Sequence, residues 1–284
     1  MWALKMRFRH EAILVFLLAA ALLLTPAVVV AHGGEDDGHP GEGGAMLDEK
    51  IRQGTFQAVV AGGVLLVLFV GISAVMKQRG KLKGAMSGAL FLAIAAVVIA
   101  VTAYVAGSTI YLNIVSETGG PVHWHADFEI WNCGSHVDLV DPSGFSNKVG
   151  SAVMHEHGDS RMHVEGVIVD YTDASVGKFI AAIGGELRSG WLRVPTTSGE
   201  VTMMDGDTCG NGKGKLQVFV WKTSNGRAVQ ERITGYSDYV ISPHGQVPPG
   251  DCIILEFDSG QKESTERMCE SYEAAIKRGA LNGG

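Results

Sequence analysis

Charged side chains are missing from three long stretches in the first 114 residues of this chain of 284. Residues 12–31, 55–76 and 85–114 contain no Asp, Glu, Lys or Arg. About 20 consecutive apolar residues are enough to cross a bilayer as a helix. An ion or proton pathway through a membrane needs ionisable side chains within the spans. Their absence indicates that the membrane part is an anchor.

Cysteine is scarce and absent from the first 132 residues. The chain has four cysteines, Cys133, Cys209, Cys252 and Cys269, all after the apolar stretches. An even number on one side of these stretches is typical of two disulfides in an oxidising compartment. Three pairings are open, and the sequence does not choose between them.

Positive charge is in short supply in the C-terminal part. Residues 113–284 hold 14 Lys and Arg against 23 Asp and Glu, a net charge of −9. This balance argues against nucleic acid as a partner. The chain also lacks a phosphate-binding loop, and its serines do not form a nucleophile elbow.

The first apolar stretch has the layout of a secretory signal. Lys5, Arg7 and Arg9 precede it, and the small residue Ala31 ends it at a suitable cleavage position. We predict a signal peptide at residues 1–31, with an uncleaved signal anchor as the alternative because the stretch is long.

Residues 32–54 are rich in glycine and acidic residues and show no apolar periodicity. They are predicted to be a disordered extracytoplasmic linker. His32 and His39 stand among these acids and could collect metal ions weakly. A solvated linker is the simpler interpretation.

Residues 55–114 predict two transmembrane helices joined by a basic loop at residues 77–84. This loop carries four cations, Lys77, Arg79, Lys81 and Lys83. Because short cationic loops stay in the cytoplasm, residues 115–284 are expected on the extracytoplasmic side of the cytoplasmic membrane. Besides the lipid bilayer, a second copy of the chain is a candidate partner, since glycines such as Gly62 and Gly63 allow close helix packing.

The C-terminal part, residues 115–284, predicts a mixed, mainly antiparallel α+β domain with two helices. One helix is expected after a cap at Thr172 or Asp173, ending at Ile183, and another after Ser264, ending before Gly279. Alternating apolar residues, and the turn Asn225-Gly226, predict strands. The expected strands are residues 122–132, 162–171, 191–195, 200–203, 215–223, 227–233 and 252–257.

Six of the ten histidines lie between residues 121 and 166. They include two His-x-His pairs, His123 with His125 and His155 with His157, and the nearby His163. Residues two apart on a strand project to the same side. Each pair can therefore direct two imidazoles at one metal ion, and neighbouring strands would bring three or four together, with His163 as a fifth ligand or an orienting group.

Carboxylates are interleaved with these histidines. The candidates for orienting an imidazole or acting as a base are Asp127, Glu129, Glu156, Asp159 and Glu165. Asp127 and Glu129 are equally consistent with a solvated strand face. His136 and His244 stand alone and are interpreted as ordinary polar residues. Imidazole binds several transition metals, and an extracytoplasmic, disulfide-bearing domain favours copper or zinc.

Two known metal-binding motifs are matched only in part by this sequence. The segment from Asp205 to Cys209 opens like a calcium loop, but Cys209 stands at its fifth position and Leu216 at its twelfth. We expect a turn held by a disulfide there. The spacing from His123 to Glu129 matches half of a cupin motif, without the glycines that the motif needs.

The run MHEHGDSRMHVEG, followed by SVGKFIAAIGGEL, resembles a segment of an uncharacterised group of membrane-anchored, extracytoplasmic bacterial and archaeal domains. In that group a His-x-His strand precedes a His-x-His-Asp…His-x-Glu segment and a Leu-Gly-x-Phe-Phe helix start. Here Gly158 separates His157 from Asp159, and Val176 replaces the usual Leu. The resemblance covers residues 122–257 and implies a small α+β domain with a His-lined site, but no activity.

These observations predict a membrane-tethered extracytoplasmic protein that handles or senses copper or zinc. A metal-dependent hydrolase or oxidoreductase at the same histidines is one alternative, with a metal-activated water and one of the carboxylates as base. A structural or partner-binding domain without metal is the other.

Overall fold

The computed structural model describes residues 42–241 and 250–282. The expected signal or anchor at residues 1–31, together with His32, His39 and His244, lies outside them. The chain divides near residue 112 into a helical unit and a C-terminal domain, each described here by itself. The described residues form four α-helices and mixed sheets, which confirms the α+β class.

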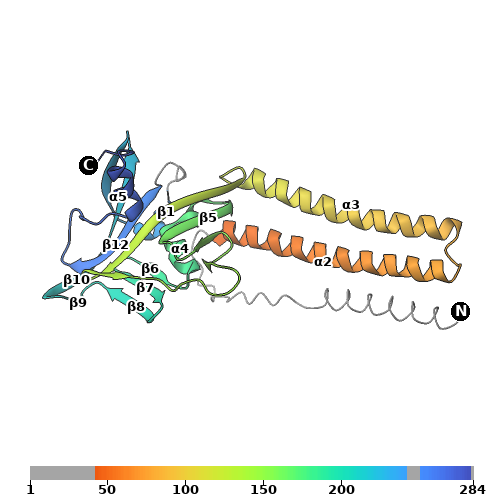
Figure 1. Cartoon of the computed structure of the whole chain (residues 1–284), viewed down its shortest axis with the longest axis horizontal. Coiled ribbons are helices and arrows are strands. Elements are labelled where there is room, and N and C mark those ends of the chain that lie inside the picture. The colour runs from red at the N-terminus through yellow and green to blue at the C-terminus, as the bar shows by residue number, and fades with distance from the viewer. Residues whose placement is uncertain (1–41, 242–249, 283–284) are drawn as a thin grey trace. The chain divides into compact units, whose positions relative to one another are not determined.

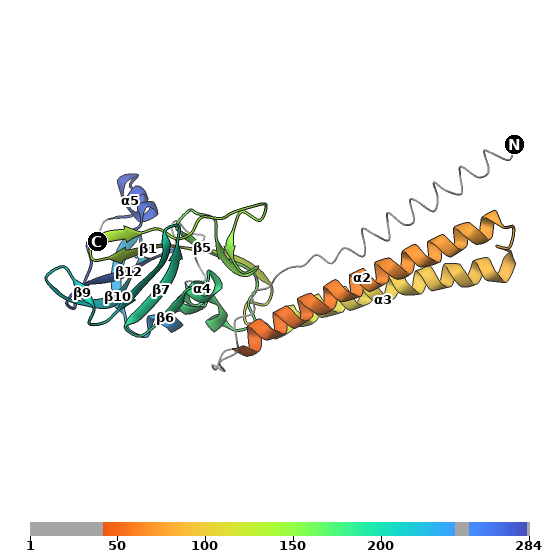
Figure 2. The same ribbon diagram turned by 90° about the horizontal axis from the view of Figure 1, so that it is seen from below.

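The helical unit is a pair of long apolar helices. Helix α2 (Glu42–Gln78) and helix α3 (Gly84–Val115) run side by side in opposite directions (Figures 1 and 2). Both are long and apolar enough to cross a membrane. A Cβ at Gly62 would lie 2.6 Å from Cγ2 of Val101, so glycine permits the close approach of the helices at this point.

Helix α2 begins earlier than the sequence predicts. Residues 42–54 are helical rather than part of a disordered linker. Strong helix formers, including Leu47, occupy this segment. Glu49 accepts hydrogen bonds from Arg52 Nε at 2.9 Å and from Gln53 Nε2 at 2.7 Å. Side-chain pairs three or four residues apart, like these, stabilise a helix.

The C-terminal domain is built on a nine-stranded sheet within the described residues. Its strands are β1 (Pro121–Asn132), β2 (Ser135–Val137), β3 (Val149–Gly150), β4 (Met154–Glu156), β5 (Arg161–Val167), β9 (Thr208–Cys209), β10 (Gly212–Ser224), β11 (Arg227–Ile233) and β12 (Asp251–Ser259). The order is β11-β10-β12-β1-β5-β4-β3, with β2 beside β1 and β9 beside β10. Only β1 and β12 pair in parallel in this described sheet, so it is mainly antiparallel as predicted.

A second sheet and a short helix cover one face of the large sheet (Figure 1). The second sheet consists of β6 (Glu186–Arg188), β7 (Trp191–Thr196) and β8 (Gly199–Met204), and the helix is α4 (Val176–Ala182). Buried side chains such as Phe128, Phe179 and Ile253 form the main core here. The apolar half of β1 therefore faces inward, as its alternation predicts.

The opposite face of the large sheet is only partly covered. Helix α5 (Glu270–Lys277) packs its Tyr272 against Phe219 of β10 and Ile254 of β12 in a smaller core. The remaining part of this face belongs to β1, β5 and β4. It carries the polar side chains that alternate, along each strand, with the apolar side chains of the main core.

Both domain helices begin later than predicted. Ser175, rather than Thr172 or Asp173, caps α4, because Asp170 already caps a separate 3-10 turn, η1 (Tyr171–Ala174). Helix α5 starts after Cys269 rather than after Ser264. The intervening segment is irregular, and its carbonyls at Thr265 and Arg267 accept hydrogen bonds from the side chains of Gln230 and Trp221, respectively.

The expected strand at 162–171 also ends early, at Val167. Ile168 turns away to hydrogen-bond the Thr118 hydroxyl at 3.2 Å. A second 3-10 turn, η2 (Tyr236–Asp238), follows β11. By contrast, Asn225 and Gly226 take positive φ values of 51° and 73°, as a tight hairpin turn requires.

Two disulfides fasten the domain, and they settle the pairing that the sequence leaves open. Cys133 pairs with Cys209, and Cys252 pairs with Cys269. The first ties the end of β1 to the turn at residues 205–210, as predicted for that turn. The second ties β12 to the start of α5.

Candidate metal centre

Strand register brings the two His-x-His pairs together. Strand β5 lies between β1 and β4, and His163 is paired with His125 on one side and His155 on the other. These three histidines form a row across three adjacent strands. Because their neighbours Ala126, Met162 and Met154 point into the main core, the alternation of a strand turns the histidines to the opposite face.

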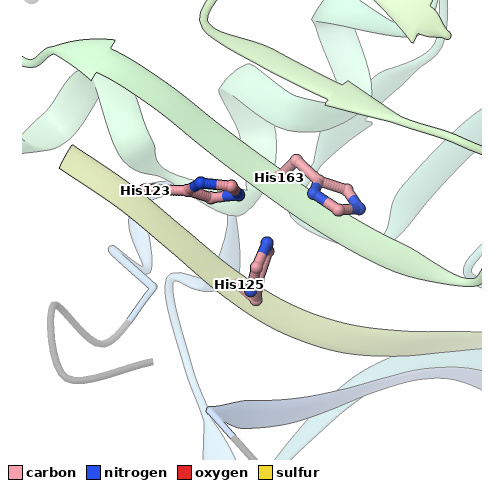
Figure 3. Close-up of side chains that lie close together, drawn as sticks. All are labelled: His123, His125 and His163. Atoms are coloured by element: carbon pink, nitrogen blue, oxygen red, sulfur yellow. The ribbon is translucent and has the colours of Figure 1, made fainter. Parts of the chain in front are cut away.

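The β1 pair and His163 form one half of the cluster. The ring centroids of His123 and His125 are 4.6 Å apart, and those of His125 and His163 are also 4.6 Å apart. Figure 3 shows the three rings directed toward a common space above β1 and β5.

The β4 side supplies the other half. The His157 ring lies 4.9 Å from that of His155 and 4.7 Å from that of His163. His155 and His163 stack at 5.5 Å with nearly parallel planes. His163 therefore contacts both pairs and is the centre of the cluster, a position more prominent than that of the fifth ligand expected from the sequence.

Two local features place His155 on β4 and His157 directly after it, and the sequence pattern did not reveal either. Gly150 has a φ of 124°, and a Cβ there would lie 2.8 Å from Cα of His155, so only glycine lets β3 approach β4 this closely. Nδ1 of His157 is hydrogen-bonded to the carbonyl of Asn147. A backbone carbonyl leaves no signature in the sequence.

Solvent exposure decreases across the cluster. The His123 side chain is 55% exposed, whereas that of His155 is 1% exposed. Nε2 of His125 and Nδ1 of His155 are buried and have no hydrogen-bond partner in the described part of the chain. A buried polar atom without a partner is costly. Two such nitrogens, one on each side of β5, each fit a metal ion as the missing partner.

Burial lowers the pKa of the three imidazoles in the row. The pKa of His125 is lowered to about 4, mainly by burial and in smaller part by charges on His163 and His123. Burial, and then Lys148, lower the pKa of His155 to about 4, against the opposing effect of Glu165. Burial lowers the pKa of His163 as well, while Asp159 opposes the shift. Neutral imidazole is the form that binds metals.

Two of the five candidate carboxylates lie in the cluster. Oε1 of Glu165 is 3.2 Å from Nε2 of His123, and its Oε2 is 3.9 Å from Nε2 of His155. Oδ2 of Asp159 is 3.2 Å from Nε2 of His163. Both carboxylates are more than 40% exposed, so they are able to turn toward a bound ion.

The other three candidate carboxylates are engaged elsewhere. Asp127 lies at the end of the histidine face, where it accepts from Arg161 Nε at 2.6 Å and from the hydroxyl of Ser271. Glu129 accepts from Trp131 Nε1 at 2.8 Å. Glu156 alternates with its histidine neighbours, so it points toward the core side, where Oε2 accepts from the Gly158 amide.

A sizeable hollow of the domain lies away from the histidines. A hollow of about 680 Å³ near α5 is lined by Glu129, Trp131, Glu256, Lys262 and Arg267, among others. Its most buried group, Glu256, already accepts from Lys262 and Arg267 at 3.0 Å each. His136 lies apart from the cluster too, with its ring 5.2 Å from that of Trp131. We therefore place the site by donor chemistry rather than by volume.

Two groups of histidines in the described chain have the geometry to hold a metal ion. They are His123, His125 and His163, and His155, His157 and His163, with the ligand atoms of each group within 4.8 Å of one another. Comparison of the chain with protein-family models, curated proteins and solved structures gave no match. The case for function therefore depends on the residues of the site.

Proposed function

We propose that this protein is a membrane-tethered, extracytoplasmic metal-binding protein that handles or senses copper or zinc. The observation that carries the proposal is the row of His125, His163 and His155 across three strands, with unpartnered buried nitrogens at its two ends. Imidazole nitrogen suits both metals, which bind it at about 2 Å. The candidate ligand atoms of each histidine group already lie within 4.8 Å of one another.

The proposed location has separate support. Lys77, Arg79, Lys81 and Lys83 lie at the turn between the two apolar helices, and such cationic turns stay in the cytoplasm. Since one span, α3, separates this turn from the C-terminal unit, that unit would then lie on the extracytoplasmic side. Two disulfides in that unit suit an oxidising compartment.

The gradient of exposure favours exchange of the ion over permanent burial. His123 and Glu165 are open to solvent at one edge, while His155 is enclosed at the other. A structural zinc site is normally closed by four protein ligands. An ion with an exposed ligand at its rim remains accessible to a partner or chelator, as handling or sensing requires.

The proposal predicts that Zn²⁺ stabilises the wild-type chain but not a variant without the histidine row. At a free Zn²⁺ concentration 100 times the Kd, the expected gain in unfolding free energy is about 2.7 kcal/mol. The variant His125→Ala/His155→Ala/His163→Ala leaves one histidine of each pair, and Zn²⁺ should not raise its unfolding free energy. Thermal unfolding of the purified full-length protein with and without Zn²⁺ measures this difference.

His136→Ala is the matched control, because His136 is exposed and outside the cluster. It should respond to Zn²⁺ like the wild type. Circular dichroism must show that the row variant keeps its sheet. Equal stabilisation of the wild type and a folded row variant would rule out the histidine site.

A further inference from the structure

We propose that the cluster binds two metal ions at once and that His163 is a ligand to both; this inference rests on the proposed function. Each of the two histidine groups is complete in itself. Three imidazoles are the protein ligands of many open metal sites. The groups have one member in common, His163, and each adds its own His-x-His pair.

The two groups lie on opposite sides of β5. His123 and His125 stand on β1, His155 stands on β4 with His157 directly after its end, and β5 separates these strands. In the described part of the chain, every ring contact between the two pairs passes through His163. Two strand spacings, about 9.5 Å, separate β1 from β4, and neither of the two groups in the described chain combines a flanking histidine of β1 with one from the β4 side. Two ions use the full set.

The ring of His163 is placed to serve both sides. It meets His125 edge-on at 4.6 Å with an interplanar angle of 80°, and His157 at 4.7 Å with 79°. An imidazole ring has two nitrogens on different sides, and both bind metal at once when the ring releases its remaining N–H proton to solvent and becomes an imidazolate. Asp159, now beside Nε2 of His163, is 44% exposed and is able to turn aside or join the ion at that nitrogen.

Negative charge is available for both ions. The carboxylate of Glu165 places one oxygen beside a histidine of each group, at 3.2 Å from His123 and 3.9 Å from His155. It is therefore located between the two proposed ions, where it reduces their mutual repulsion. Asp159 adds a second carboxylate at the shared histidine.

The test uses Cu²⁺ with the metal-free full-length protein, in a background where His32→Ala/His39→Ala removes the tail histidines. Two equivalents are expected to bind tightly. Two Cu²⁺ ions bridged by one imidazole couple magnetically, so the EPR intensity per copper should fall as the second equivalent binds. The variants His123→Ala/His125→Ala and His155→Ala/His157→Ala should each bind one equivalent with full EPR intensity.

Saturation of the intact cluster at one equivalent would overturn the two-ion inference while leaving the proposed function in place. Two equivalents with full, additive EPR intensity would overturn the sharing of His163. Binding of no Cu²⁺ would overturn both the inference and the proposed function.

Discussion

Lowering the pH from 7.5 to 5 is expected to destabilise the metal-free protein by about 4 kcal/mol through two histidines, about 2 kcal/mol from each. The pKa of His125 and that of His155 are about 4 in the folded domain, against about 6.5 in an unfolded chain. The folded state therefore binds fewer protons. The stabilisation is fully present above pH 6.5 and is lost as the pH falls toward 4.

Urea unfolding at several pH values, followed by tryptophan fluorescence in the presence of a chelator, measures this loss. The variant His125→Gln/His155→Gln is the control and should show a much flatter dependence between pH 7 and 5. Glu156 acts in the opposite direction, because burial raises its pKa and favours the folded state in acid. Two results would contradict the burial of these imidazoles. One is a wild type that is no less stable at pH 5 than at pH 7.5. The other is a wild type whose unfolding free energy depends on pH as weakly as that of the variant.

Loss of the Cys133–Cys209 disulfide is expected to lower the unfolding free energy by about 4.5 kcal/mol, and loss of Cys252–Cys269 by about 3 kcal/mol. The difference follows from the lengths of chain that they close, because the paired residues are 76 and 17 positions apart. A longer closed loop removes more conformational entropy from the unfolded chain. The two losses together approach the whole stability of a typical domain.

Urea unfolding of Cys133→Ala/Cys209→Ala and Cys252→Ala/Cys269→Ala, each beside the wild type, measures both values. The wild type in reductant should be less stable than either variant. The domain should accordingly fail to fold in a reducing cytosol, in keeping with the proposed location. A fully reduced wild type as stable as the oxidised protein would contradict the structural role of these bonds.

Local patterns in the sequence predict the strands that have one buried face. The alternation in β1 is visible because Trp124, Ala126, Phe128 and Ile130 face the main core and the residues between them do not. The hairpin of β10 and β11 is equally predictable, since Asn225-Gly226 fits its tight turn. Each of these features depends on a few consecutive residues.

Helix starts were less predictable because several caps compete. Thr172, Asp173 and Ser175 are all suitable capping residues. The amide of Val176 donates to the carbonyl of Tyr239, and that of Ile241 to the carbonyl of Ala174, so distant residues fix where α4 begins. Such contacts are not encoded in the local sequence.

The composition of the candidate site was predictable, but its arrangement was not. Two His-x-His pairs predict a cluster of imidazoles. The central position of His163, by contrast, follows from the place of β5 between β1 and β4. Likewise, spacing alone gave no means of separating Glu165, which lies in the cluster, from Glu129, which bonds Trp131. Long-range strand pairing decides both questions.

Metal analysis of the full-length protein, purified without chelators, is the most direct test of the central claim. The histidine cluster predicts at least one copper or zinc ion per chain in the wild type and in His136→Ala. The folded variant His125→Ala/His155→Ala/His163→Ala should carry none. A wild type without stoichiometric metal, or a row variant with as much metal as the wild type, would contradict the account.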